Sequence, residues 1–252
     1  MKSINKDLLK VNIYETRDEM GKAAAADVKA CIISLLENKE YINMIFAAAP
    51  SQNEVLAALA NDKEIPWNRV NAFHMDEYIG LSPNAPQGFG NFLKEHIFGI
   101  APFKSVNYID ISASDAEAEC ERYSKLLKDH PTDIVVMGIG ENGHIAFNDP
   151  PVADFNDKKA VKPVQLDEVC RNQQVNDGCF AKLDDVPKTA ITLTVPTLFA
   201  GDYLFCVVPA KTKANAVKAT LSDEIDEHCP ATILRKHKNA VLYLDCDSSA
   251  LL

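Results

Sequence analysis

The sequence predicts an α/β fold of three layers, in which a mostly parallel sheet carries helices on both faces. Segments with strand character alternate with segments of helical spacing along the chain, and this order is typical of parallel sheets connected by helices. Most strands are continuous apolar runs, as in Ile134–Met137, which indicates burial on both faces. No repeat or linker divides the chain, so we expect residues 1–252 to form one domain.

In the first half of the chain, three helix starts are indicated by capping boxes, in which Ser or Thr precedes Glu by three residues. These pairs are Thr16 with Glu19, Ser51 with Glu54, and Ser114 with Glu117. Apolar residues recur at helical spacing after each pair. Strands are expected at residues 11–14, 41–46, 70–74 and 106–109, and a further helix at residues 88–98.

In the second half, strands are expected at residues 134–137, 190–195, 203–208 and 241–244, with a helix at residues 213–220. Residues 152–188 are polar and interrupted by prolines. An excursion of this length inside a compact domain is often functional, so we expect a lid over the site.

The composition argues against several kinds of partner and cellular setting. The formal net charge is -10, which disfavours nucleic acid and anionic membranes as partners. The 7 cysteines are odd in number, and no C-x-x-C or zinc-site spacing occurs, so we expect reduced thiols in a cytoplasmic protein. Neither a signal peptide nor an apolar run of membrane-spanning length is visible. The sequence leaves a homo-oligomer open.

The stretch Gly138–Pro150 has the clearest chemical character. It follows the buried strand Ile134–Met137, and its three glycines allow a sharp turn and close approach to a ligand. His144 lies at the tip, and Asp149 follows five residues later. A carboxylate beside an imidazole fixes its tautomer and raises its basicity, so this pair suits proton transfer better than a purely structural role in the loop.

The same glycines match the dinucleotide-binding pattern G-x-G-x-x-G, but their context does not. That pattern opens a helix, whereas Pro150 and Pro151 follow almost at once. No acidic residue closes a second strand about twenty residues later. We therefore expect no nicotinamide or flavin cofactor here.

Asp76 and Glu77 follow the strand at residues 70–74. Adjacent residues of an extended chain point in opposite directions, so at most one of them faces a cleft. A carboxylate there can take a proton from carbon, although a solvated or helix-capping acid explains the pair equally well.

Further candidates for contact with a substrate or its phosphate are Ser51, Gln52, Glu77, Gly140, Arg171 and Lys213. Ser51 and the following amides begin a helix, where an anion can bind. However, the preceding Ala47–Pro50 lacks glycines, and Pro50 has no amide hydrogen. Lys213 and Arg171 are cations that can reach a phosphate, but a plain surface role accounts for both as well.

Two motifs together resemble the glucosamine-6-phosphate deaminase family: Phe73–Leu81, with F-x-M-D-E-Y-x-G-L, and Gly138–Pro150, with G-x-G-x-N-G-H-I-A-F-N-D-P. The resemblance implies a Rossmann-like sugar-phosphate isomerase fold. It also implies isomerising deamination of glucosamine 6-phosphate, or its galacto epimer, to a ketose phosphate and ammonia in amino-sugar catabolism, without metal or other cofactor. Carried over by position, the resemblance implies that Asp76 moves a proton between C2 and C1, and that His144 opens the ring with support from Asn142 and Asp149. Phosphate contacts fall to Lys213 and Ser51.

The chain departs from this family mainly around the phosphate. The family loop, usually Thr-Gly-Gly/Ser-Thr-Pro, is replaced by Ala49–Asn53, and a family arginine has no aligned match, with Arg171 only near it. The family glutamate is Asp149, and a family serine is Gly88. Two alternatives remain: a hydrolase similar to 6-phosphogluconolactonases, and a non-catalytic protein that binds sugar phosphates.

Overall fold

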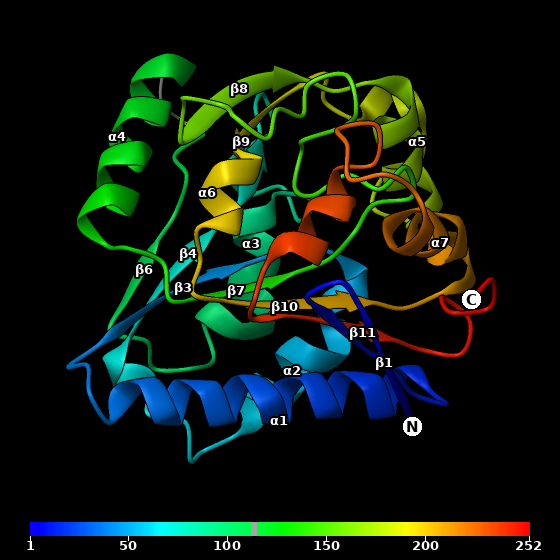
Figure 1. Ribbon diagram of the computed structural model, residues 1–252. Coiled ribbons are helices and arrows are strands. Elements are labelled where there is room, and N and C mark those ends of the chain that lie inside the picture. Colours follow the sequence, from blue (N-terminus) through cyan, green and yellow to red (C-terminus); the bar gives the residue numbers. More distant parts are fainter. Residues whose placement is uncertain (112–114) are drawn as a thin grey trace.

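The computed structural model describes residues 1–111 and 115–252 and confirms the predicted layered α/β architecture (Figure 1). The main sheet has eight strands in the order β1-β2-β11-β10-β7-β3-β4-β6. Neighbouring strands run parallel except for the antiparallel pair β1 and β2. The strands are β1 (Lys2–Lys6), β2 (Leu9–Ile13), β3 (Ile42–Phe46), β4 (Val70–His74), β6 (Ser105–Asn107), β7 (Ile134–Met137), β10 (Tyr203–Val208) and β11 (Ala240–Leu244).

Helices connect these strands and cover both faces of the sheet. They are α1 (Arg17–Leu36), α2 (Asn53–Asn61), α3 (Phe89–Leu93), α4 (Ala116–Asp129), α5 (Glu168–Asn176), α6 (Val195–Phe199) and α7 (Ala214–Ser222). Short 3₁₀ segments cover Pro50–Gln52, Trp67–Arg69, Leu183–Asp185, Lys211–Lys213 and Pro230–Lys236, and a π turn covers Lys94–Phe98. Within the described ranges, no helix has both the length and the apolar character needed to cross a bilayer.

The side chains of β7 show how the central strands divide two apolar cores. Ile134 and Val136 belong to the core under α1 and α2, whereas Val135 and Met137 belong to the core under α4, α6 and α7. Figure 1 shows α1 and α2 below the sheet and the other three helices above it. Alternate residues of a strand point to opposite faces, so a strand buried on both faces has to be apolar throughout, as the sequence predicted.

Two of the predicted helix starts differ in outcome. The Thr16 hydroxyl accepts a hydrogen bond from the amide of Glu19 at 3.2 Å, which confirms the start of α1. The capping box at Ser51 is wrong, because the chain enters a 3₁₀ turn after Ala49 with no side-chain cap. Its expected partner Glu54 instead pairs with Arg17 at 2.7 Å. Pro50, whose missing amide hydrogen suits the first helical position, begins this turn earlier than the box predicted.

The start of the helix expected after Ser114 involves residues outside the described ranges. Ser114 itself lies outside them. Asp115 is the N-cap of α4, because its carboxylate accepts hydrogen bonds from the amides of Glu117 and Ala118.

A second, three-stranded antiparallel sheet lies beside the main one, in the order β5-β9-β8. Its strands are β5 (Asp76–Tyr78), β8 (Val161–Gln165) and β9 (Thr189–Leu193). The sequence predicted a strand near β9 but not its partners, because β5 is short and acidic and β8 contains lysine and proline. Residues 152–188 thus contain both β8 and α5, and their role as a lid stays a prediction.

Candidate active site

A pocket lies at the carboxyl ends of β10, β7, β3 and β4, which are neighbours in the main sheet. It is lined by residues from 47–52 after β3, 75–76 after β4, 138–147 after β7, and by Lys213 after β10. These four segments, each at the end of a strand, therefore converge on one pocket. Ligands of open α/β sheets bind at this edge because the loops there meet above the strands.

Asp76 lines this pocket and is only 6% exposed. Its strand β5 pairs with β9, with Asp76 opposite Thr192. Burial, and then the neighbouring charge of Glu77, raise the pKa of Asp76 well above its ordinary value. Because each protonation state is then accessible closer to neutral pH, this carboxyl group suits both accepting and returning a proton.

His74, which the sequence did not single out, fixes the backbone beside Asp76. Its ring is fully buried, and Nε2 accepts a hydrogen bond from the amide of Ile109 at 2.9 Å. The other nitrogen, Nδ1, must therefore carry the proton, which it donates to the carbonyl of Asp76 at 2.9 Å. Burial lowers the pKa of His74 to about 4, so the ring is a neutral structural element.

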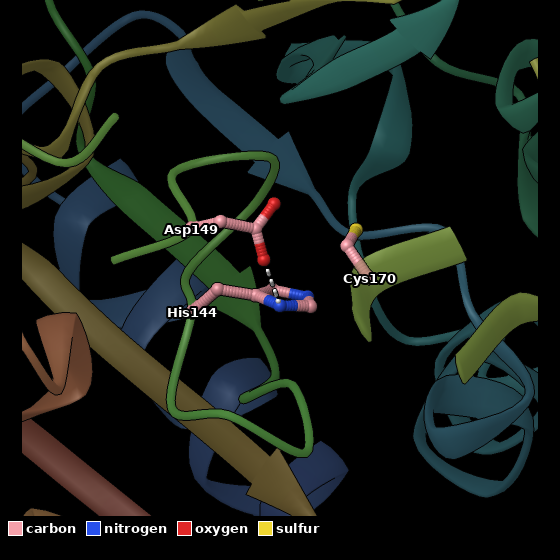
Figure 2. A group of neighbouring side chains, drawn as sticks. All are labelled: His144, Asp149 and Cys170. Carbon is pink, nitrogen blue, oxygen red and sulfur yellow. Dashed lines mark ion pairs between the residues drawn. The ribbon is translucent and has the colours of Figure 1, made fainter. Parts of the chain in front are cut away.

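His144 forms a hydrogen-bonded cluster with Asn142 and Asp149. Figure 2 shows the contact between the imidazole and the Asp149 carboxylate. Its Nδ1 lies 2.8 Å from Oδ1 of Asn142 and 3.0 Å from Oδ1 of Asp149. The Asn142 amide also donates to Oδ1 of Asp149 at 2.9 Å. Burial acts to raise the pKa of Asp149, but the interactions with His144 and Asn142 outweigh it and leave the pKa lowered. The carboxylate thus holds the imidazole with Nδ1 protonated and Nε2 free to exchange a proton.

The turn that presents His144 depends on two glycines. The amide of Gly140 donates to the carbonyl of His144 at 2.9 Å, which closes the turn. Gly143 has φ of +85°, a conformation that side chains disfavour, and a Cβ atom there would lie 2.5 Å from Sγ of Cys229. The glycines therefore allow the backbone conformation of the turn and its close packing against Cys229.

The second sheet connects the loop of His144 to the segment of Asp76. The side chain of Asn148, which is fully buried, donates to the carbonyls of Ile145 and Leu193. Thr192, which pairs with Asp76 across β5 and β9, accepts a hydrogen bond from the amide of Phe147 at 3.1 Å. Strand β9 therefore sets the position of one candidate acid–base group relative to the other.

Lys213 is the cation of the pocket: among the described residues, no other lysine or arginine lines it. Its side chain is 5% exposed. Burial lowers the pKa of Lys213, although Asp177 and Glu141 act in the opposite direction. A buried ammonium group with few close partners favours binding of an anion.

The loop after β3 is organised by side chains in place of glycines. Gln52 is fully buried, and its amide nitrogen donates to the carbonyl of Val207 and to the hydroxyl of Ser51, both at 3.1 Å. Arg17, at the start of α1, donates a hydrogen bond to the carbonyl of Pro50. Ser51, Gln52 and Lys213 all line the pocket, so the structure brings these three predicted residues to one site.

Glu77 and Arg171, both predicted to contact substrate, do not line the pocket. The Glu77 carboxylate accepts hydrogen bonds from the amides of Tyr78, Phe89 and Gly90. The Arg171 guanidinium donates to the carbonyls of Leu183 and Val186 within the same excursion. Both side chains are buried because they form hydrogen bonds with nearby backbone groups, so their burial requires no ligand.

The residues of α5 that do face the pocket were not predicted. They are Gln173 and Gln174, followed by Asp177 at the helix end. With Cys170 they have the spacing i, i+3, i+4 and i+7, which places them on one helical face. This spacing is present in the sequence, but the segment lacks a regular apolar stripe, so no helix was predicted there. Arg171, the cation that was predicted to contact substrate, lies on another face of the helix.

Comparisons with known proteins identify the family of this chain. Residues 15–243 match the family model described as glucosamine-6-phosphate isomerases/6-phosphogluconolactonase. A glucosamine-6-phosphate deaminase of Lactobacillus delbrueckii subsp. bulgaricus is 29% identical over 97% of this chain and 100% of its own length. One of Bacillus cereus is 32% identical over 96% of this chain and 89% of its own.

Solved structures show the same fold. A monomeric glucosamine-6-phosphate deaminase has a TM-score of 0.86 and 27% identity, covering 96% of this chain and 99% of its own. A 6-phosphogluconolactonase of Trypanosoma brucei has a TM-score of 0.81 and 17% identity over 100% of both chains, and this second likeness shows the fold alone. The family match covers most of the chain, and the chain therefore belongs to the glucosamine-6-phosphate isomerase/6-phosphogluconolactonase family.

Proposed function

We propose that the protein is an aldose–ketose isomerase and deaminase of an amino-sugar phosphate, glucosamine 6-phosphate or its galacto epimer, in amino-sugar catabolism. One observation carries the proposal: Asp76 and His144 line the same pocket as Lys213. A carboxyl group of raised pKa, a carboxylate-supported imidazole and an ammonium group are the three functions that this reaction needs. The curated relatives with about a third of their residues identical carry the deaminase name.

The reaction divides between the two acid–base groups. His144 takes the proton of the C1 hydroxyl on Nε2, and Asp149 stabilises the imidazolium that forms. The imidazolium then gives this proton to the ring oxygen as the bond between C1 and that oxygen breaks, which opens the ring to the aldehyde. Asp76 then takes the proton from C2 and returns it to C1, while a proton passes from the amino nitrogen to the C1 oxygen, which converts the amino aldose into a ketose imine. Water adds to the imine carbon, and ammonia leaves with the ketose phosphate as the second product. A proton transfer accompanies each bond that forms or breaks, and the overall reaction gains and loses no electrons, so general acid–base groups are sufficient.

The far end of the pocket receives the phosphate in this proposal. Lys213 supplies the positive charge, and the Ser51 hydroxyl supplies a further hydrogen bond. Residues 152–188, through Gln173 and Gln174 of α5, cover the bound substrate as a lid. The lid is tested by limited proteolysis, since cleavage within residues 152–188 should slow when a sugar phosphate is bound.

The reaction is tested by measuring ammonia release from glucosamine 6-phosphate and galactosamine 6-phosphate, beside hydrolysis of the lactone of 6-phosphogluconate. We expect ammonia release with at least one amino sugar and no lactonase activity. Asp76→Asn should abolish turnover but keep substrate binding, because it removes the base and preserves the shape. Lactone hydrolysis without ammonia release would identify the lactonase alternative, and binding without either activity would identify the non-catalytic one.

A further inference from the structure

His144, Asp149 and Cys170 form a cluster of three potential metal ligands from two separate parts of the chain. One ligand atom of each residue, an imidazole nitrogen, a carboxylate oxygen and the sulfur, lies within 4.8 Å of the other two. Figure 2 shows the imidazole and the carboxylate together on the loop after β7, with the thiol on α5. All three residues are buried, with exposed fractions of 8%, 1% and 1%.

The chemistry of the donor set selects the kind of ion. A neutral imidazole, a carboxylate and a thiolate are the ligands that Zn²⁺ takes in proteins, at about 2.0–2.3 Å from the ion. Mg²⁺ and Ca²⁺ prefer oxygen throughout, so the nitrogen and sulfur disfavour them. A site with three protein ligands leaves a fourth position for water or another ligand, and His144 is the ligand of this set that lines the pocket.

A second observation points to a cation. Oδ1 of Asp149 is engaged by Asn142 and His144. Its other oxygen, Oδ2, is buried, and the Cys170 thiol acts as a hydrogen-bond donor to this carboxylate. A thiol is a weak donor, and a cation in place of its proton would bind the carboxylate and the sulfur together.

We propose that His144, Asp149 and Cys170 form a Zn²⁺ site, and that Zn²⁺ bound there inhibits the enzyme reversibly by occupying the imidazole that substrate needs. On binding, the S–H bond of Cys170 breaks, a sulfur–zinc bond forms, and the proton passes to the buffer. The inhibition rests on the proposed function, because it requires His144 to act in turnover. The binding itself does not.

Binding is tested on the full chain with Zn²⁺ in competition with a chromophoric zinc indicator, and with Co²⁺ as a spectroscopic probe. We expect one equivalent of Zn²⁺ to bind, and the Co²⁺ complex to show a thiolate-to-metal charge-transfer band. In Cys170→Ser and in Cys170→Ala, affinity should fall at least tenfold and the band should vanish. Cys246→Ser is the matched control, because Cys246 is exposed, and it should bind as the wild type does.

Activity provides a separate readout. Zn²⁺ should inhibit ammonia release competitively with the amino-sugar phosphate, EDTA should restore the rate, and each Cys170 variant should resist inhibition relative to its own uninhibited rate. Equal Zn²⁺ affinity in wild type and both Cys170 variants, or a Co²⁺ complex without the thiolate band, would overturn the metal site even if the enzyme is active. A protein that binds Zn²⁺ through Cys170 but releases no ammonia would overturn the proposed function and leave the site standing.

Discussion

Gly140 lies so close to the imidazole of His144 that a Cβ atom at position 140 would stand 2.1 Å from Cε1 and 2.3 Å from both ring nitrogens. The ring occupies the space that any side chain at this position would need. Gly140 was expected to contact substrate and does line the pocket, and its absent side chain also determines where the imidazole lies. The second glycine of the turn is therefore part of how the proton-transfer group is positioned.

We predict that Gly140→Ala lowers kcat/KM for ammonia release about a hundredfold or more, because a displacement of about 1 Å at a reacting group has effects of that size. The methyl group cannot fit beside the ring, so the ring must leave its position between Asn142 and Asp149. Steady-state kinetics of ammonia release, with glucosamine 6-phosphate or galactosamine 6-phosphate according to which is turned over, measures the effect.

Gly88→Ala is the control for the same chemical change. A Cβ atom at Gly88 meets nothing nearer than 3.3 Å, and its φ of -63° suits alanine. Its kcat/KM should stay within a few-fold of the wild type. Similar losses in both variants, or a full rate in Gly140→Ala, would show that the contact with His144 does not govern turnover.

A second prediction concerns the stability of the fold in acid. His74 has a pKa of about 4 in the folded chain and 6.5 in an ordinary environment. As pH falls from 6.5 towards 4, the unfolded chain takes up a proton at His74 and the folded chain does not. The contribution of this residue, about 3 kcal/mol of unfolding free energy, is therefore present above pH 6.5 and lost towards pH 4.

The variant His74→Asn isolates this contribution. Its amide nitrogen can replace Nδ1 as donor to the Asp76 carbonyl, but the acceptor for the amide of Ile109 is lost. Urea unfolding should show the variant less stable than the wild type at pH 7.5, with the difference narrowing by about 3 kcal/mol as the pH reaches 4. A difference that is constant with pH would mean that His74 does not titrate in this way.

Glu77 is the subject of a third prediction. Its carboxylate accepts hydrogen bonds from three backbone amides, at Tyr78, Phe89 and Gly90, and its charge is the second cause, after burial, of the raised pKa of Asp76. Glu77→Gln should lower the unfolding free energy by about 1–3 kcal/mol, since an amide group accepts fewer of these hydrogen bonds. Urea unfolding at neutral pH measures this loss.

The same variant should change the pH profile. If Asp76 acts as the ionised base, kcat/KM falls on acidification through its raised pKa, and removal of the Glu77 charge moves this fall to lower pH. The fall should stay above the ordinary value of 3.8, because burial remains. An unchanged profile in a folded Glu77→Gln protein would separate Glu77 from the titration of Asp76.

Local sequence patterns were sufficient to predict most of the fold and the acid–base residues of the site. Continuous apolar runs identified the central strands, and the glycine-rich turn identified His144 and Asp149, because these signals lie within a few neighbouring residues. The antiparallel sheet escaped prediction because its pairing joins Asp76 to Thr192, far apart in sequence. The role of His74 was not predicted for the same reason, because its ring nitrogen accepts a hydrogen bond from the amide of the distant residue Ile109.

The anion-binding half depended on long-range packing and was predicted less well. Ser51 shows the capping-box spacing but does not cap, because Pro50 begins a 3₁₀ turn. Arg171 has the right charge in the right segment, yet its helix turns it towards Val186. The cluster with Cys170 has no zinc-like spacing because its members come from a loop and a separate helix. Charge and spacing alone do not reveal which face of a helix meets the pocket.

The fourth prediction concerns Lys213. Lys213→Ala should raise KM about ten- to a hundredfold with a much smaller change in kcat, because a charged hydrogen bond contributes about 1.5–3 kcal/mol to binding and the phosphate does not react. Lys211→Ala is the control, since Lys211 lies in the same 3₁₀ turn but is exposed and does not line the pocket. Equal KM values in wild type and Lys213→Ala would remove Lys213 from the substrate site.

The pH dependence of KM gives an independent test of the same residue. Burial lowers the pKa of Lys213 below 10.5, so the ammonium group loses its proton at a lower pH than a surface lysine does. KM of the wild type should therefore rise on the alkaline side as the charge is lost, whereas KM of Lys213→Ala should already be high and should not rise further for this reason. Parallel alkaline profiles in the two proteins would mean that another group holds the phosphate.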